Sequence, residues 1–375
     1  MKKRPHLIIA GTTIAMIALV GTPSISEAAE DKKSYLIGFE AAEEVEQFTT
    51  DLENEVGIQS NDEIDVTYEF KDIPVLAVEM TEEEFNELES ENGISYIEED
   101  QEVTTMAQSI PWGIDRIGAP AAQAAGVTGS GVNVAVLDTG IDPHPDLNVQ
   151  GGVSFVPGES GSDDGNGHGT HVAGTIAALD NNEGVLGVAP DVDLFAVKVL
   201  SASGSGSISS IAQGLEWAAD NDMDVANLSL GSPSPSQTLE QAVNDASDSG
   251  VLVVAASGNS GTASLGYPAR YENAMAVGAT DQSDNLASFS QYGEGLDIVA
   301  PGVGVESTYP GGGYDSLSGT SMATPHVAGA AALVKQQNPG WTNEQIRAHL
   351  NDTATDLGDS FRFGSGLLDA ENALQ

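Results

Sequence analysis

The C-terminal 269 residues of this 375-residue chain predict an α/β fold built on a mostly parallel sheet. Short runs rich in Val, Ile, Leu and Ala alternate with stretches of helical periodicity. The runs are apolar at nearly every position, which is typical of strands covered by helices on both faces. A different, smaller unit precedes this block.

The first 28 residues have the pattern of a secretory signal peptide. Lys2-Lys3-Arg4 precedes the apolar run Leu7–Val20, and Ser26-Glu27-Ala28 places small side chains before a cut. A membrane anchor is the alternative, but the run has 14 residues, short of the roughly 20 that a spanning helix needs. We expect the remaining chain to be secreted, extracellular and free of the membrane.

Residues 29–106 predict a small α+β unit. A helix is expected from Thr81 to Leu88, where Thr81 and Glu84 fit a capping box. The unit has 25 acidic and 3 basic residues, so it repels itself and should need a partner or salt for stability. Its strand-like runs are Ser34–Phe39, Val75–Val78 and Ile94–Ile97.

Residues 107–375 supply the elements of the parallel sheet. Strands are expected at Val132–Leu137, Leu194–Val199, Val225–Leu230, Val251–Ala256 and Ala274–Gly278. Helices are expected at His168–Leu179, Ser209–Asp220, Ser236–Ser249, Thr320–Gln336 and Asn343–Leu350. Functional sites of such sheets form at the carboxyl ends of strands, so these ends are where chemistry is expected.

Composition excludes several classes of function. The chain has no Cys, which rules out a thiol nucleophile, a disulfide and a thiolate metal site. Its 57 acidic and 12 basic residues give a formal net charge of −45. Such a charge repels phosphate backbones and anionic lipids, so no nucleic-acid partner is expected.

Two segments carry a carboxylate and imidazoles at expected element ends. Asp138 follows an apolar strand and is either a turn-capping residue or a carboxylate able to orient a base. His168 and His171 lie in a Gly-rich helix start. A zinc site is the alternative there, but the acidic residue of an H-E-x-x-H motif is absent. Two structural histidines also remain possible.

A third segment places Ser321 at the start of a helix of small residues. The hydroxyl could merely cap that helix. It could also be a nucleophile, since free N–H groups and the positive helix end stabilise an oxyanion. Asn259 follows another apolar strand and can donate a side-chain N–H to the same oxyanion.

The three segments together specify one reaction. A serine hydroxyl needs a base to attack an amide, and His168 can take its proton and return it to the leaving amine. Asp138 would hold the imidazole in the required tautomer and favour its charged form. The predicted catalytic residues are therefore Asp138, His168, Ser321 and Asn259.

These segments, in this order and spacing, resemble the subtilisins, which are secreted serine endopeptidases. The resemblance spans the whole chain, and Gln108-Ser109-Ile110-Pro111-Trp112-Gly113 is similar to the high-alkaline branch. It implies a doubly wound catalytic domain over residues 107–375. It also implies a ferredoxin-like propeptide over residues 29–106 that inhibits the enzyme until autoprocessing between Met106 and Ala107. Asn259 and the backbone N–H of Ser321 would form the oxyanion hole.

The resemblance also assigns the substrate cleft. An extended peptide would pair with two of its segments, where small side chains leave backbone groups accessible. A flexible loop is the alternative for the first segment, and a dinucleotide loop would need a further glycine. The implied substrate-binding residues are Gly204, Ser205, Gly206, Ile208, Ser229, Leu230, Gly231, Ala256, Ser257 and Gly258.

Calcium is the cofactor that the resemblance implies. Oxygen ligands suit this hard cation, although the Asn-rich loop could be a plain helix-terminating turn. The implied ligands are the side chains of Gln108, Asp146 and Asn181 and the carbonyls of Leu179, Glu183 and Val185. A weaker cation site would use the carbonyls of Ala269, Tyr271 and Ala274.

The sequence departs from the high-alkaline branch in its charge. Residues 107–375 carry 31 acidic and 6 basic residues, a net charge of −25, whereas that branch is usually basic. We expect a halophilic or haloalkaliphilic enzyme, because concentrated salt screens repulsion between like charges. Improved solubility alone is the alternative.

The expected function is broad-specificity hydrolysis of peptide bonds by a secreted, monomeric, alkaline-active and salt-tolerant serine endopeptidase. Its expected partners are protein substrates and its own propeptide. Two alternatives stay open at this point: an inactive binding protein on the same fold, and an esterase or lipase using the same triad chemistry.

Overall fold

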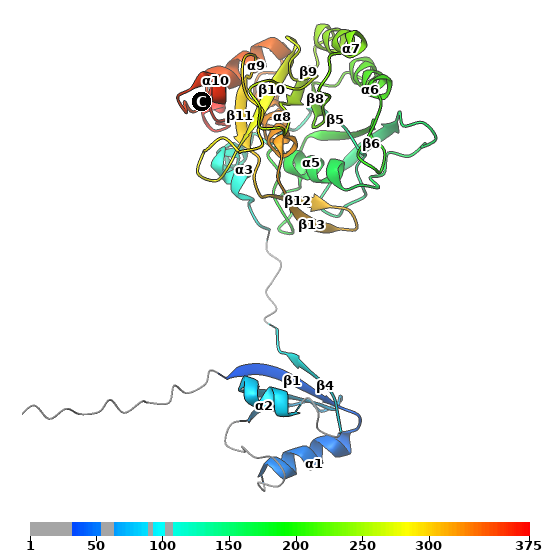
Figure 1. Cartoon of the computed structure of the whole chain (residues 1–375), viewed down its shortest axis with the longest axis vertical. Helices are drawn as coiled ribbons and strands as arrows, with labels where there is room; N and C mark the ends of the chain where they lie inside the picture. The colour runs from blue at the N-terminus through cyan, green and yellow to red at the C-terminus, as the bar shows by residue number, and fades with distance from the viewer. Residues whose placement is uncertain (1–31, 54–63, 89–92, 102–107) are drawn as a thin grey trace, which may run out of the picture. The chain divides into compact units, whose positions relative to one another are not determined.

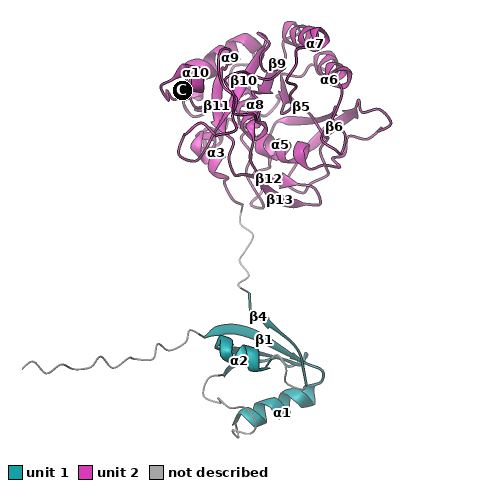
Figure 2. Cartoon of the chain, in the orientation of Figure 1, with its two compact units in different colours: residues 1–104 teal, residues 105–375 magenta. Residues whose placement is uncertain are grey.

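The computed structural model describes residues 32–53, 64–88, 93–101 and 108–375 (Figure 1). The chain divides into two compact units, Met1–Thr104 and Thr105–Gln375 (Figure 2). The predicted signal peptide and the predicted cut between Met106 and Ala107 lie outside the described residues. Both boundaries therefore stay predictions.

The N-terminal unit is an antiparallel sheet with two helices. The sheet order is β2-β3-β1-β4, and this arrangement confirms the expected ferredoxin-like α+β fold. The backbone N–H of Thr81 donates to a Glu84 carboxylate oxygen at 2.7 Å, so the capping box is also present. The elements are β1 (Lys33–Phe39), α1 (Ala42–Glu53), β2 (Asp65–Glu69), β3 (Val75–Met80), α2 (Glu82–Leu88) and β4 (Ile94–Glu99).

The C-terminal unit is built on a seven-stranded sheet in which all neighbouring strands are parallel. The order is β11-β10-β9-β8-β5-β7-β6. The strands are β5 (Asn133–Asp138), β6 (Val149–Ser154), β7 (Asp193–Lys198), β8 (Val225–Leu228), β9 (Leu252–Ala256), β10 (Ala274–Thr280) and β11 (Ile298–Pro301). A separate antiparallel hairpin consists of β12 (Val305–Tyr309) and β13 (Gly313–Leu317).

Helices cover both faces of this sheet, which confirms the doubly wound α/β prediction (Figure 1). Alternate β5 side chains belong to two separate cores: Val134 and Val136 pack on the side of α5 and α8, and Ala135 and Leu137 on the side of α6 and α7. The helices are α3 (Trp112–Arg116), α4 (Ala119–Ala124), α5 (His168–Ala177), α6 (Ile208–Asp220), α7 (Gln237–Asp248), α8 (Thr320–Gln337), α9 (Asn343–Asp352) and α10 (Ser360–Phe363), followed by the 3-10 helix η1 (Asn372–Leu374).

The chain order of the strands places a switch point between β5 and β8. After β5 the chain adds β6 and β7 on one side, and it then returns to add β8 to β11 on the other. Ligand sites of open parallel sheets form at such a point, outside the carboxyl ends of the strands. Asp138 ends β5, and Ser229 directly follows β8, so the two residues lie at this edge.

The expected strand at residues 225–230 ends two residues earlier than predicted, at Leu228. Ser229 turns its hydroxyl toward helix α8 instead of continuing the sheet, since it donates to the Ser321 carbonyl at 2.8 Å. The segment after β8 is thereby free to line a cleft.

None of the helices in the described residues combines the length and the hydrophobicity that a membrane-spanning helix requires.

Candidate active site

Asp138 and His168 lie in hydrogen-bonding contact at this edge of the sheet. The Nδ1 of His168 lies 2.7 Å from a carboxylate oxygen of Asp138, which is fully buried. The same oxygen accepts the Thr139 backbone N–H at 2.7 Å. An Nδ1–H that donates to the carboxylate leaves Nε2 of a neutral imidazole as the proton acceptor.

A glycine permits this contact. Helix α5 begins at His168, and its second residue, Gly169, packs against the chain just beyond β5. A Cβ at this position would collide with the Gly140 carbonyl oxygen. The Gly-rich sequence therefore brings the first turn of α5 close enough for the imidazole to reach Asp138.

Asp164 joins the β5 end to the start of α5. One of its oxygens accepts the Thr139 hydroxyl at 2.8 Å and the Gly167 N–H at 2.9 Å, and the other accepts the N–H and hydroxyl of Thr170. Burial alone would raise the pKa of Asp164, but these hydrogen bonds outweigh it and hold the pKa below its ordinary value. The sequence alone did not predict a role for Asp164.

The electrostatics favour the charged imidazole. Burial alone would lower the pKa of His168, but the negative charge and hydrogen bond of Asp138, with the charge of Asp164, raise it above 6.5. An imidazole whose protonated form is stabilised in this way is suited to accept a proton during a reaction.

Ser321 lies in the first turn of helix α8 and is almost buried, with 9% of its surface exposed. Its hydroxyl donates to the backbone carbonyl of Ser229 at 3.1 Å. The structure shows no hydrogen bond between Ser321 and His168 in the described part of the chain. The predicted nucleophile is therefore hydrogen-bonded to Ser229, and Ser229 lines the same cavity as His168.

The Asn259 side chain is oriented by helix α8. Its Oδ1 accepts both the backbone N–H of Thr320 at 2.8 Å and the Thr320 hydroxyl at 2.9 Å. The amide nitrogen is therefore left to donate elsewhere. Asn259 and Ser321 line one cavity of about 480 Å³, so the amide and the serine face the same space.

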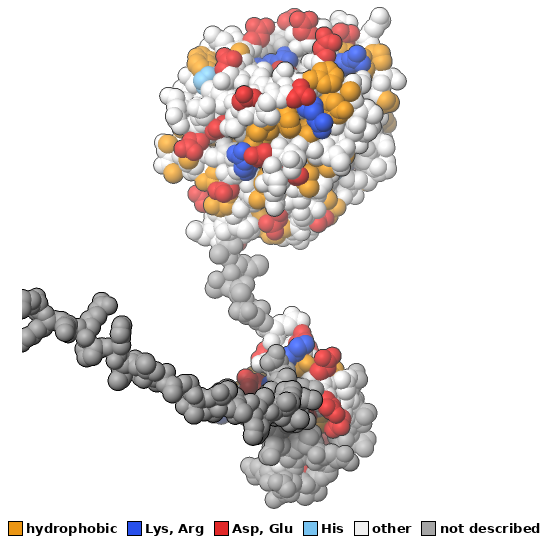
Figure 3. Space-filling view, turned by 60° about the vertical axis from the view of Figure 1, so that its left-hand side comes forward, with side chains coloured by type: hydrophobic (Ala, Val, Ile, Leu, Met, Phe, Trp, Pro, Cys, Tyr) orange, Lys and Arg blue, Asp and Glu red, His pale blue; other side chains and the backbone are white. Residues whose placement is uncertain are grey.

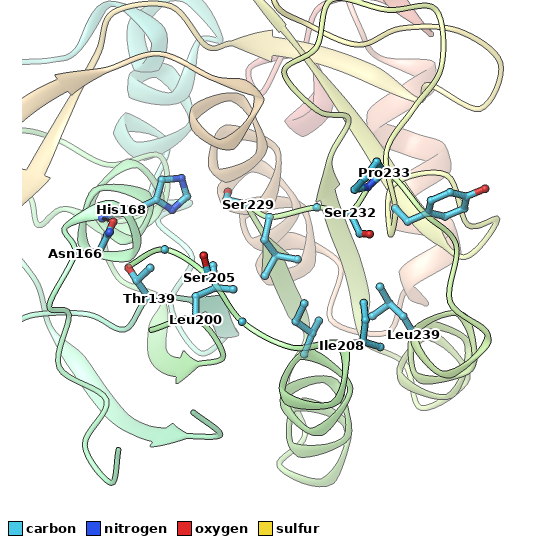
Figure 4. Close-up of a pocket in the computed structure, with 16 residues that line it drawn as sticks. Thr139, Asn166, His168, Leu200, Ser205, Ile208, Ser229, Ser232, Pro233 and Leu239 are labelled. Atoms are coloured by element: carbon cyan, nitrogen blue, oxygen red, sulfur yellow. Dashed lines mark hydrogen bonds between the residues drawn. The ribbon is translucent and has the colours of Figure 1, made fainter. Parts of the chain in front are cut away.

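The predicted substrate residues line two adjoining cavities. The first, of about 500 Å³, contains His168 together with Gly204, Ser205, Gly206, Ile208, Ser229, Leu230 and Gly231 (Figure 4). The second contains Ala256 and Gly258 and shares Leu230 and Gly231 with the first. Ser257 lines neither, because its fully buried hydroxyl donates to the Gln291 carbonyl.

Some cleft residues had no signal in the sequence. Tyr267 lines the first cavity, and its backbone exchanges two hydrogen bonds with Ser232, at 2.7 and 2.9 Å. Pairing between segments 35 residues apart is a tertiary contact that local patterns do not encode. The other residues of the first cavity that the prediction missed are Thr139, Asn166, Leu200, Ile211, Ser232, Pro233 and Leu239.

The predicted calcium loop gathers oxygen ligands around a buried carboxylate. Asp146 is 1% exposed, and burial, partly offset by hydrogen bonds from Val185 and Asn181, raises its pKa. The carbonyls of Leu179 and Val185 both accept from the Gln108 side-chain nitrogen, so they converge. One carboxylate with amides and carbonyls fits a hard cation.

One detail differs from the expected ligand set. Gln108 turns its amide nitrogen, not its oxygen, toward the carbonyls, so calcium binding would require the amide to turn over. The Glu183 N–H donates to the Asn181 side chain at 2.8 Å, which does not involve the Glu183 carbonyl that was expected as a ligand. At the second expected cation site, the Tyr271 carbonyl accepts the Ala274 N–H, and Ala269 is buried.

The contact between Asp138 and His168, with Ser321 and Asn259 lining the adjoining cavity, is the arrangement of a serine hydrolase on a doubly wound sheet. Residues 129–366 match the Subtilase family of peptidases, and the chain belongs to this family. It is 66% identical to "Alkaline protease" of Alkalihalobacillus alcalophilus over the full length of both chains. It is 75% identical to "Subtilisin Savinase" of Lederbergia lenta over 71% of this chain and 99% of the relative. It is 51% identical to "Thermostable alkaline protease" of Halalkalibacterium halodurans over 96% and 98% of the two chains.

The protein is therefore a subtilisin-type serine protease of the alkaline protease group. This confirms the resemblance to the high-alkaline branch that the sequence predicted. It also favours peptide-bond hydrolysis over the two alternatives, an inactive binding protein and an esterase.

Proposed function

We propose that Ser321 is the nucleophile of this protease, His168 its general base and acid, and Asp138 the carboxylate that orients His168. The observation that carries the proposal is the 2.7 Å contact between Asp138 and Nδ1 of His168 beside the cleft that Ser229 lines. Rotation of the Ser321 side chain away from the Ser229 carbonyl would bring its hydroxyl toward Nε2. Catalytic hydrogen bonds often tighten only when substrate is bound.

The chemistry follows from these positions. Nε2 of His168 takes the hydroxyl proton as the Ser321 oxygen attacks the substrate carbonyl, and a tetrahedral oxyanion forms. The Asn259 amide and the Ser321 backbone N–H donate to that oxyanion. The imidazolium then gives its proton to the leaving amine, an acyl-enzyme remains on Ser321, and water releases it by the reverse steps.

Substitution Ser321→Ala tests the nucleophile and the maturation step together. The full-length variant should remain an uncut precursor and show no hydrolysis of casein, while the wild type should yield a chain that begins at Ala107. N-terminal sequencing and a casein assay measure the two results. A variant that matures and hydrolyses casein at the wild-type rate would contradict the assignment.

We also propose that the N-terminal unit is a propeptide that inhibits the protease until it is cut off after Met106. A destructive enzyme requires such control before export. The predicted signal peptide is consistent with secretion, and the mature enzyme would act as a monomer on protein substrates with broad specificity. Small residues at the cleft, Gly204, Gly206 and Gly231 among them, leave backbone groups accessible to an extended peptide.

Calcium binding at Asp146 is part of the proposal. Gln108, Asp146 and Asn181, with carbonyls of Leu179, Glu183 and Val185, would hold the ion, which neutralises a buried carboxylate and ties the loop to the N-terminal segment of the catalytic unit. The carbonyls of Ala269, Tyr271 and Ala274 would form the weaker site. An ion that binds only the folded state stabilises that state. Removal of calcium with a chelator should therefore lower the melting temperature, and an unchanged melting temperature would contradict the calcium proposal.

A further inference from the structure

We propose that Ser229 is a positioning residue for Ser321. The Ser229 hydroxyl donates to the Ser321 carbonyl and so replaces the helical N–H donor that Pro325 lacks. The proposal rests on the function proposed for Ser321. It concerns the side chain of Ser229 and not the substrate contacts of its backbone. Three observations lead to it: a proline in a helix, a donor from another element, and a fixed direction for that donor.

The first observation is the position of Pro325 inside α8. In an α-helix the carbonyl of each residue accepts the N–H of the residue four positions later. For Ser321 that residue is Pro325, which has no N–H and whose ring crowds the same carbonyl. Ser321 is nearly buried, so its carbonyl has little access to water and needs another donor.

The second observation is that Ser229 provides this donor. Its hydroxyl lies 2.8 Å from the Ser321 carbonyl oxygen, and only 3% of the residue is exposed. The Ser321 hydroxyl in turn donates to the Ser229 carbonyl at 3.1 Å. The two residues therefore exchange a pair of hydrogen bonds that ties the start of α8 to the segment after β8.

The third observation fixes the direction of the Ser229 hydroxyl. The side-chain amide nitrogen of Asn227, on β8, lies 3.0 Å from the hydroxyl oxygen and can only donate to it. Asn227 is fully buried. Its donation occupies the acceptor side of the hydroxyl, so the proton of Ser229 is directed toward Ser321. The sheet thus holds the nucleophile through Asn227 and Ser229.

The consequence is a specific effect on catalysis. Without the Ser229 hydroxyl, the Ser321 carbonyl would have no donor, and the first turn of α8 would shift relative to His168, which lines the same cleft as Ser229 (Figure 4). A small displacement of a nucleophile lowers the rate of the chemical step far more than it weakens substrate binding. We expect kcat to fall and KM to change little.

The test uses an isosteric pair at this position. Ser229→Thr keeps the hydroxyl and adds a methyl group. Ser229→Val introduces a side chain of the same shape as threonine but without a hydroxyl. On a peptide substrate, kcat of Ser229→Val should be about tenfold or more below that of Ser229→Thr, with similar KM values. Equal kcat values in the two variants would overturn the proposal.

A second variant separates this role from direct contact with substrate. Pro325→Ala restores the backbone N–H at position 325, so the Ser321 carbonyl regains its helical donor. The kcat lost in Ser229→Ala should then be recovered largely in Ser229→Ala/Pro325→Ala, relative to Pro325→Ala alone. If the two substitutions act independently, kcat of the double variant will be the product of the two separate effects. Agreement with that product to within about twofold would contradict the proposal. A double variant that yields no mature enzyme, although Pro325→Ala does, would contradict it as well.

Two controls complete the design. Thr324→Val removes a buried hydroxyl from the same helix, but its acceptor, the Thr320 carbonyl, keeps the helical N–H of residue 324. Its kcat should stay within about threefold of the wild type. Ser321→Ala distinguishes the two levels of the argument: activity in that variant refutes the proposed function, whereas an inactive Ser321→Ala with equal Thr and Val variants at position 229 refutes only this inference.

Discussion

At the scale of single residues, Asp164 shows how a buried charge can be stabilised without a cation. Its two oxygens accept hydrogen bonds from Thr139, Asn166, Gly167 and Thr170, and no Lys or Arg pairs with it in the described parts of the chain. Thr139 follows Asp138, and Thr170 lies in the first turn of α5. Asp164 therefore determines how the carboxylate and the imidazole of the proposed triad meet.

Asp164→Asn tests this role. The amide would set its NH₂ group against N–H donors, and the charge that helps raise the pKa of His168 would be lost. We expect kcat/KM to fall by about tenfold or more. We also expect the acid limb of the pH profile to move to lower pH, because the base stays neutral at more acidic pH. The measurement is kcat/KM of the mature enzyme between pH 5 and pH 10.

Asp163→Asn is the matched control, since it removes the same charge one residue away without those hydrogen bonds. Its pH profile should remain close to that of the wild type. An acid limb in Asp164→Asn that coincides with the wild-type limb would refute the electrostatic part of the prediction.

At the scale of elements, helices α5 and α8 each carry a buried neutral histidine. Burial lowers the pKa of His171 and of His326 to about 4. His171 donates from Nε2 to the Val305 carbonyl, and His326 donates from Nδ1 to the Met322 carbonyl. The second ring nitrogen of each has no hydrogen-bond partner among the described residues. Protonation would place an N–H without an acceptor in the core.

These histidines predict a loss of stability in acid. The unfolded chain binds protons below pH 6.5, and the folded chain resists them until about pH 4. The free energy of unfolding should therefore fall as pH drops through this window, by about 1.4 kcal/mol per pH unit for each imidazole. Guanidinium unfolding of the mature enzyme, inactivated with a sulfonyl fluoride, measures this slope.

His326→Gln should reduce the slope by one proton. The glutamine can still donate to the Met322 carbonyl but does not titrate. A variant whose stability depends on pH as steeply as that of the wild type would show that His326 is not responsible.

At the scale of the whole molecule, the net charge of −25 over residues 107–375 distinguishes the protein most clearly from what the family resemblance implies. Acidic side chains are scattered over the face shown in Figure 3, with fewer basic ones among them. Four of the six basic residues form ion pairs: Arg116 with Asp284, Lys198 with Glu159, Lys335 with Asp224 and Arg347 with Asp297. Most acidic groups therefore repel one another through solvent.

We predict that the melting temperature of the mature enzyme rises from dilute buffer to molar NaCl. The screening length shortens from about 10 Å at 0.1 M to about 3 Å at 1 M salt, which weakens repulsion between surface carboxylates. Calorimetry of the inhibited enzyme at constant calcium concentration measures the change. Equal melting temperatures at both salt concentrations would leave solubility as the explanation of the charge.

The class of fold and the types of residue at the site could be predicted from local patterns in the sequence. Short apolar runs that alternate with helical patterns are typical of strands in a helix-covered sheet, and Asp138, His168, Ser321 and Asn259 each lie beside a strand end or helix start. Which of these groups form hydrogen bonds with one another could be seen only in the folded structure. The bonds of Asp164 to Thr139, of Ser229 to Ser321 and of Thr320 to Asn259 join segments that are 25 to 92 residues apart. Such contacts depend on the packing of strands and helices in space, because a hydrogen bond requires a distance that no local pattern specifies.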